Sequence, residues 1–181
     1  TGVELRHELV EKCNTLAAEA AFEQLHFTTG SIDTAELSSP DMLIALHACD
    51  IATDQAIARG IQANSKVIIC APCCHKQIRK QLQPANDLKA ITRFGILEER
   101  QAEILTDTIR ALVLEAYGYK TKVFEFISTE HTPKNVLIVG IQSKKQEKPN
   151  AEVLERIRQL KALFNVGYHE LENQLGLHEE K

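Results

Sequence analysis

Two clusters of His, Cys and Asp side chains follow two short apolar runs. Met42–Leu46 is followed by His47, Ala48, Cys49 and Asp50, and Val67–Cys70 leads to Cys73, Cys74 and His75. Each run is too short to span a membrane, and one helix-length segment separates them, a pattern typical of buried parallel strands. In open α/β sheets, ligands bind beyond the carboxyl ends of the strands. We therefore expect both clusters to meet in one crevice that carries the chemistry.

The residue types in these clusters are those of a proton-transfer site. Imidazole and carboxylate groups can serve as general bases, so His47, Asp50 and His75 are the candidate catalytic residues. Thiols and imidazoles are also the ligands that zinc prefers. Adjacent Cys73 and Cys74 on an extended chain should point in opposite directions, however, so the sequence predicts a site without metal. A zinc-binding domain is the weaker alternative, and a cysteine that attacks a pyrimidine ring covalently is another.

Strands and helices are expected to alternate along the chain, which predicts an α/β fold. Asp50 is the expected N-cap of a helix over residues 51–61, and Gly118 is expected to end a helix over residues 97–116. The short link between the last two strands permits an antiparallel pair. The expected strands are Gly2–Leu5, Leu25–Thr29, Met42–Leu46, Val67–Cys70, Val123–Ile127 and Val136–Ile141, and the expected helices cover residues 6–21, 51–61, 97–116 and 151–164.

Composition limits the classes of protein that the chain can form. Its 181 residues, 44% of them apolar, are enough for one good core. A net charge of −4 excludes a general polyanion-binding field. Five cysteines, an odd number, do not indicate a disulfide framework, so a reducing, cytoplasmic location is expected. No apolar run is long enough for a membrane helix, and no membrane partner is expected.

A polar insertion at residues 76–94 has a local excess of positive charge. Such a group suits a phosphate backbone, although a solvated helix face is the simpler interpretation, because no aromatic residues interleave for base stacking. The histidines outside the two clusters, His7, His26, His169 and His178, lie on polar or mixed faces and are expected to have no specific role. The charges of the insertion are Lys76, Arg79, Lys80, Lys89 and Arg93 against Asp87.

The chain resembles the C-terminal part of a class I S-adenosylmethionine-dependent methyltransferase. The resemblance covers about residues 1–143 and rests on Gly2–Leu5, Gly30–Asp33, the His-Ala-Cys-Asp turn, the Cys-Cys-His turn and residues 124–135. Within the class, the two turns are similar to those of some tRNA 2′-O-methyltransferases. The resemblance implies a Rossmann-like sheet, mostly parallel with a C-terminal antiparallel pair, and methyl transfer to RNA. Residues 144–181 would form a linker and a helical appendage.

The resemblance also implies roles for individual residues. Glu4 would bind the ribose hydroxyls of S-adenosylmethionine. Three residues, Ser31, Ile32 and Asp33, would flank the adenine. Near the methionine end of the cofactor would lie His47, Ala48 and Cys49. Independently of the resemblance, we expect the substrate to contact Cys73, Cys74, Lys76, Glu130 and His131, because loops at this edge of an α/β sheet carry function.

One departure from the family pattern is large. The family's first strand, with its glycine-rich turn, would precede Thr1 and lie between the strands that end at Glu4 and at His47. Its absence leaves two unpaired strand edges in the middle of the sheet. We therefore expect a fragment of a longer protein whose missing N-terminal region, or another chain, completes the sheet. A noncatalytic, methyltransferase-like interaction module is the alternative function.

Overall fold

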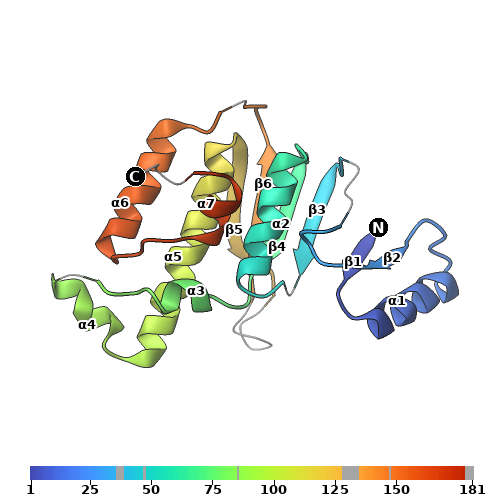
Figure 1. Cartoon of the computed structure of the whole chain (residues 1–181), viewed down its shortest axis with the longest axis horizontal. Helices are drawn as coiled ribbons and strands as arrows, with labels where there is room; N and C mark the ends of the chain where they lie inside the picture. Colours follow the sequence, from blue (N-terminus) through green and yellow to red (C-terminus); the bar gives the residue numbers. More distant parts are fainter. Residues whose placement is uncertain (36–38, 47, 85, 128–134, 147, 178–181) are drawn as a thin grey trace. The chain divides into compact units, whose positions relative to one another are not determined.

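The computed structural model describes residues 1–35, 39–46, 48–84, 86–127, 135–146 and 148–177. The chain forms two compact units, Thr1–Ser38 and Ser39–Lys181 (Figure 1). Both units contain helices and strands, so the expected mixed α/β character is confirmed. Within the described residues, no helix is long and apolar enough to cross a membrane.

The N-terminal unit contains two short parallel strands and one helix. Strand β1 (Gly2–Glu4) pairs with β2 (Phe27–Thr29), and α1 (His7–Glu19) connects them. The side-chain amide of Asn14 in α1 ties the helix to β2, since Oδ1 accepts from the backbone N–H of Phe27 at 2.8 Å and Nδ2 donates to its carbonyl at 3.0 Å. These two bonds attach the start of β2 to α1.

The second unit is built on a four-stranded sheet in the order β3-β4-β6-β5. Strands β3 (Met42–Leu46) and β4 (Val67–Ala71) are parallel, with α2 (Ile51–Gln62) between them in the chain. Strands β5 (Tyr119–Glu125) and β6 (Val136–Gln142) are antiparallel to each other, and β6 is antiparallel to β4. The predicted antiparallel pair is therefore confirmed.

Helices α2 and α5 (Gly95–Ala116) cover one face of this sheet (Figure 1). The core lies there and includes the fully buried side chains of Ile57, Ile68 and Ile109. Gly60 in α2 allows the close approach, because a Cβ at this position would lie 2.8 Å from the side chain of Ile68. Side chains alternate between the two faces of a strand. Ile68 faces the helices, as does Leu43, its partner in β3, so the residues on either side of Leu43 point away from the helices.

The opposite face of the four-stranded sheet is exposed, and it is apolar along β3. Met42, Ile44 and Leu46 of β3 are each at least half exposed. By register, Ile141 lies beside Met42 across β4, and Phe124 of β5 belongs to the same face. Among the described residues, no helix packs against this face. A surface with this much exposed apolar area usually marks a contact site.

Four smaller helical segments complete the second unit. They are α3 (Lys76–Arg79), the 3₁₀ turn η1 (Asn86–Leu88), α4 (Lys89–Thr92) and α7 (Glu170–Gln174). The longer α6 (Ala151–Leu163) packs against α5, and α7 packs against α2. The C-terminal helices thus lie within the second unit, while the expected family boundary after residue 143 stays a prediction.

The long helix ends as its sequence predicts. Gly118 follows the end of α5 with φ of +86°, a conformation that favours glycine. A Cβ there would lie 2.3 Å from the carbonyl oxygen of Lys144. The close contact and the positive φ both explain why glycine ends α5.

Candidate functional site

At the carboxyl ends of β1 and β2, Glu4 lies beside the loop that leaves β2. The backbone N–H of Gly30 donates to the carbonyl of Glu4 at 3.1 Å. The Glu4 carboxylate accepts at Oε1 from the backbone N–H and from Nε of Arg6, at 3.1 and 3.0 Å. These bonds from Arg6 hold the pKa of Glu4 below its ordinary value. Glu4 is therefore an ionised, partly exposed acceptor.

The loop after β2 is organised by its own hydroxyl groups. Ser31 and Thr34 exchange hydrogen bonds between side chain and backbone, and their hydroxyl oxygens lie 3.0 Å apart. Ile32 is half-buried and Asp33 is exposed. The structure therefore brings together Glu4, Ser31, Ile32 and Asp33 at one end of the N-terminal unit.

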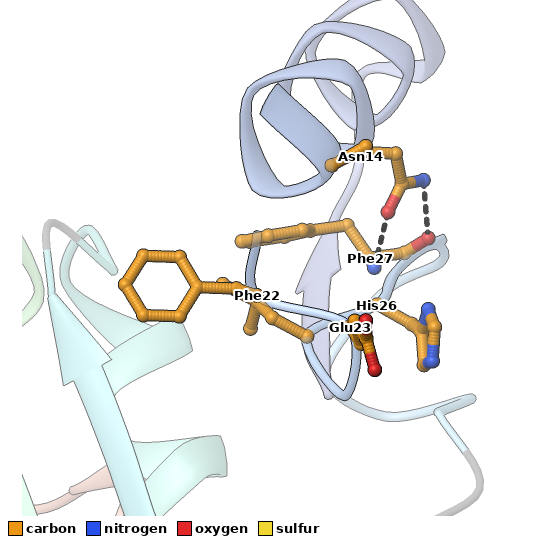
Figure 2. A pocket seen from close by; sticks show the side chains of 7 residues that line it. Asn14, Phe22, Glu23, His26 and Phe27 are labelled. Atoms are coloured by element: carbon orange, nitrogen blue, oxygen red, sulfur yellow. Dashed lines mark hydrogen bonds between the residues drawn. The ribbon is translucent and has the colours of Figure 1, made fainter. Parts of the chain in front are cut away.

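An open hollow of about 330 Å³ lies at the other end of this unit. Figure 2 shows it beside the turn that precedes β2, with Phe22 and Glu23 on that turn. It adjoins Phe27 at the start of β2, whereas Glu4 and Thr29 mark the strand ends. Because ligands of α/β sheets bind beyond the carboxyl ends of strands, we do not assign the hollow to the predicted cofactor contacts.

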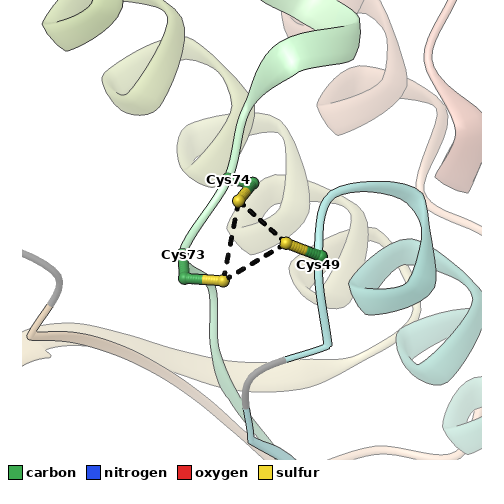
Figure 3. A group of neighbouring side chains, drawn as sticks. All are labelled: Cys49, Cys73 and Cys74. Carbon is green, nitrogen blue, oxygen red and sulfur yellow. Dashed lines mark hydrogen bonds between the residues drawn. The ribbon is translucent and has the colours of Figure 1, made fainter.

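In the second unit, three cysteines meet beyond the carboxyl ends of β3 and β4. Figure 3 shows the sulfurs of Cys49, Cys73 and Cys74 directed at one another. The Sγ atom of Cys49 lies 3.7 Å from that of Cys73 and 2.8 Å from that of Cys74, and the last two are 3.8 Å apart. The expectation that the two cysteine turns converge holds for these three residues.

The prediction that Cys73 and Cys74 point in opposite directions is wrong. Strand β4 ends at Ala71, and the backbone from Pro72 to His75 is neither strand nor helix, so the alternation of an extended strand does not apply. Cys70 stands in Cys-x-x-Cys spacing with Cys73, but it is buried inside β4 and outside the cluster. Burial raises the pKa of Cys70 to about 12, which keeps this thiol protonated and inert.

Asp50 does not cap α2 with its side chain, contrary to the sequence prediction. It occupies the N-cap position with φ of +50° and ψ of −113°, and its carboxylate accepts from the backbone N–H of Gln77 at 3.0 Å. The side chain thus satisfies an amide of the first turn of α3 instead. A positive φ is a strained conformation for a residue other than glycine. At Asp50 it accompanies the hydrogen bond to Gln77, which joins the loop after β3 to the helix after β4.

A buried network of charged side chains binds the loop after β3. Arg110 of α5 is fully buried and donates from Nε to Asp54 Oδ1 at 2.7 Å, from Nη1 to Asp107 Oδ1 at 3.0 Å, and from Nη2 to the carbonyl of Asp50 at 2.9 Å. His75 is also buried, and its Nε2 lies 3.2 Å from Asp107 Oδ1. Both strand-end loops are therefore anchored to α5.

Charge state in the network follows from burial and pairing. Burial opposes the charge on Arg110, but Asp54 and Asp107 outweigh that effect and raise its pKa. Burial also raises the pKa of Asp54, and the Arg110 charge acts against that rise.

At the cysteine cluster, the hydrogen bond with Cys49 raises the pKa of Cys74. That shift disfavours the thiolate that covalent attack on a pyrimidine ring would need.

The remaining predicted site residues are placed as follows. Ala48 is half-buried, and its carbonyl accepts from the hydroxyl of Thr53. Lys76 is exposed directly after the Cys-Cys-His turn. His47, Glu130 and His131 lie outside the described residues. The catalytic roles expected for His47, Asp50 and His75 stay predictions, and the burial of His75 against Asp107 favours a positioning role for it.

Two buried residues were missed by the sequence reasoning. Arg110 had a readable signal, because Asp107 and Arg110 stand three residues apart on the face of α5 that also carries Ile109 and Val113. His169 is fully buried, although we expected no specific role for it. Its Nδ1 accepts from the backbone N–H of Leu171, and burial holds its pKa well below the ordinary value. No periodic pattern marks the short helix that it precedes.

Comparison with known families gives a match in the N-terminal part of the chain. Residues 1–81 match a methyltransferase domain family. The expected methyltransferase resemblance is confirmed for this region, which contains both β1–β2 and β3–β4 with all three clustered cysteines. The finer resemblance to class I enzymes and to tRNA methyltransferases stays a prediction.

The chain is also similar to curated proteins called glutathione S-transferase C-terminal domain-containing protein. The human and Macaca fascicularis proteins are each 28% identical, and the mouse protein is 29% identical. In each comparison the alignment covers 54% of this chain and 19% of the relative. The matched region is thus about a fifth of these longer proteins.

Proposed function

We propose that this chain contributes to S-adenosylmethionine-dependent methyl transfer, with RNA as the substrate class. The observation that carries the proposal is the methyltransferase match over residues 1–81. The parallel pairs β1-β2 and β3-β4 support a Rossmann-like sheet, but β4-β6 and β5-β6 are antiparallel, so the four-stranded sheet matches the expected mostly parallel arrangement only in part. When bound, the cofactor supplies a methyl group already activated on a sulfonium, so the protein needs mainly to align the acceptor with it.

The residues at the end of β1 fit the expected cofactor. In the described residues, Arg6 bonds Oε1 of Glu4, and no donor contacts Oε2, which can accept from a ribose hydroxyl. The loop Ser31–Asp33 follows β2 beside Glu4 and would border the adenine. Ala48 and Cys49 are proposed at the methionine end with His47. Asp50 and His75, both tied into the anchored loops, are proposed to orient the acceptor or accept its proton.

The support for RNA comes from exposed cations in the insertion after β4. Lys76, Lys80, Lys89 and Arg93 are exposed, whereas Arg79 is engaged by Glu98 and Glu99 of α5. The basic surplus available to a phosphate backbone is therefore smaller than the sequence indicated. RNA binding through the remaining cations should weaken steeply as salt is raised.

We also propose that a further strand completes the sheet beside β3. Among the described residues, β3 pairs only with β4, so its other edge is open. Another open edge belongs to β1 in the N-terminal unit. A parallel strand from the N-terminal region of a longer protein, or from another chain, would satisfy the backbone groups at the open edge of β3. The exposed apolar face of β3 equally favours the alternative function, a noncatalytic module that docks on a partner.

Calorimetric titration with S-adenosylmethionine tests the enzyme proposal. We expect measurable binding by a longer protein that contains this chain and little by the 181 residues alone. Glu4→Ala in the longer protein should weaken binding by about 10- to 100-fold, as expected for the loss of a charge-assisted hydrogen bond. Glu8→Ala, which removes an exposed carboxylate of α1, is the matched control and should bind normally. Absence of binding to both chains would instead support the module.

A further inference from the structure

The three sulfurs at the ends of β3 and β4 have the spacing of a metal ligand set. A tetrahedral Zn²⁺ with bonds of about 2.3 Å to sulfur places its ligands about 3.8 Å apart. Two of the three Sγ distances, 3.7 and 3.8 Å, match that spacing. The third, 2.8 Å between Cys49 and Cys74, is shorter and would have to open by about 1 Å on metal binding.

A disulfide accounts less well for the same arrangement. A covalent S–S bond is about 2.05 Å long, and the described residues contain no disulfide. A Cys49–Cys74 bond would also not include Cys73, whose Sγ lies 3.7 and 3.8 Å from the other two sulfurs. One ion bound by all three sulfurs explains that position, because each ligand of a tetrahedral centre is equally far from the other two.

The loops that carry the thiols are already fixed by groups outside the cluster. Arg110 binds the carbonyl of Asp50, the residue after Cys49. The Asp50 carboxylate binds the N–H of Gln77, and His75, the residue after Cys74, contacts Asp107. Such outer contacts orient metal ligands and keep the site assembled. Cys49 is exposed, so an ion and a fourth ligand can reach the cluster from solvent.

We propose that Cys49, Cys73 and Cys74 bind one Zn²⁺ ion through three thiolates, with a fourth position open to water or to an incoming ligand. Each thiol releases its proton on binding, and no electron is transferred. The resulting centre carries one net negative charge, which the exposed ammonium group of Lys76 partly offsets. Three protein ligands and an open position are the arrangement of catalytic rather than structural zinc sites.

Metal titration of the complete 181-residue chain tests this proposal without S-adenosylmethionine. The protein is prepared metal-free and reduced under anaerobic conditions. We expect one equivalent of Co²⁺ to give a thiolate-to-cobalt absorption band that Zn²⁺ then abolishes. Competition with a chromophoric chelator measures the Zn²⁺ affinity. Because no cofactor is present, failure of the metal site would leave the methyl-transfer proposal intact, and the converse also holds.

Single replacements identify the ligands. Cys49→Ala, Cys73→Ala and Cys74→Ala should each weaken Zn²⁺ binding by at least about 100-fold, since even outer contacts cost 10- to 100-fold. Cys13→Ala, in the N-terminal helix, is the control and should bind as the unchanged chain does. Circular dichroism checks that each variant folds. The proposal fails if the cobalt band is absent, if Cys13→Ala weakens binding equally, or if the anaerobically prepared chain contains a Cys49–Cys74 disulfide.

Discussion

In the N-terminal unit, the charged group at the strand end is a surface carboxylate, and its partner Arg6 is only two residues away. In the second unit, Arg110 is fully buried and joins α5 to α2 and to the loop after β3. Exposed, local ion pairs contribute little to folding. A buried pair is costly to desolvate, but removing one partner leaves an uncompensated charge. Pairs of a carboxylate with an arginine are therefore exposed and local in one unit, and buried and part of the scaffold in the other.

The largest expected effect comes from removing the buried cation. Arg110→Met leaves Asp54 and Asp107 buried without their cation, so the free energy of unfolding of the second unit should fall by about 3–5 kcal/mol. Hydrogen exchange of the α5 amides, measured at increasing urea, reports this value separately from the N-terminal unit. Arg158→Met is the matched control, because Arg158 pairs with Glu155 at the surface, and should cost about 0.5 kcal/mol. Equal losses in both variants would remove the contrast between the two units.

A pH effect of intermediate size is expected from His169. Its pKa in the folded protein lies well below the ordinary 6.5 because burial disfavours the imidazolium. As pH falls, His169 therefore binds a proton in the unfolded chain before it does so in the folded protein. The free energy of unfolding of the second unit has its full value above about pH 6.5 and declines below it. The decline should approach about 1.4 kcal/mol per pH unit. Denaturation at a series of pH values between about 7 and 5.5 measures it.

His169→Gln should remove this part of the slope, whatever it does to stability at neutral pH. His26→Gln, at an exposed position of the N-terminal unit, should leave the slope unchanged. A slope that persists in His169→Gln would show that another group carries the pH dependence.

The smallest expected effect concerns the exposed pair. Arg6→Ala should allow the pKa of Glu4 to rise only part of the way toward its ordinary value, because it removes the Nε bond and the charge of Arg6 but keeps the backbone N–H that also donates to Glu4. An NMR pH titration of the Glu4 side chain measures the shift. Denaturation midpoints should not change measurably, and Lys12→Ala on the exposed part of α1 should alter neither quantity. A clear loss of stability in Arg6→Ala would contradict the surface character of this pair.

Most elements of the fold were predictable because their signals are local. Strand β3 has the expected bounds of Met42–Leu46, and α5 ends before Gly118 as expected. Strand β5 instead begins at Tyr119 and ends at Glu125, and α7 was not predicted. The start of β5 was obscured by Lys120 and Lys122, which by the register lie on the uncovered face of the sheet and so interrupt the apolar run. The five residues of α7 are too few to establish a helical period.

The sequence by itself determined the alternation of strands and helices and the position of polar clusters at strand ends, since apolar period and glycine placement act over a few residues. Only the tertiary structure decided that Cys73 and Cys74 turn toward Cys49, that Asp50 caps α3 rather than α2, and that Arg110 supports both loops. These outcomes depend on loop backbone and on groups up to 60 residues apart in the chain. Contacts of that kind leave no periodic trace in the order of residues.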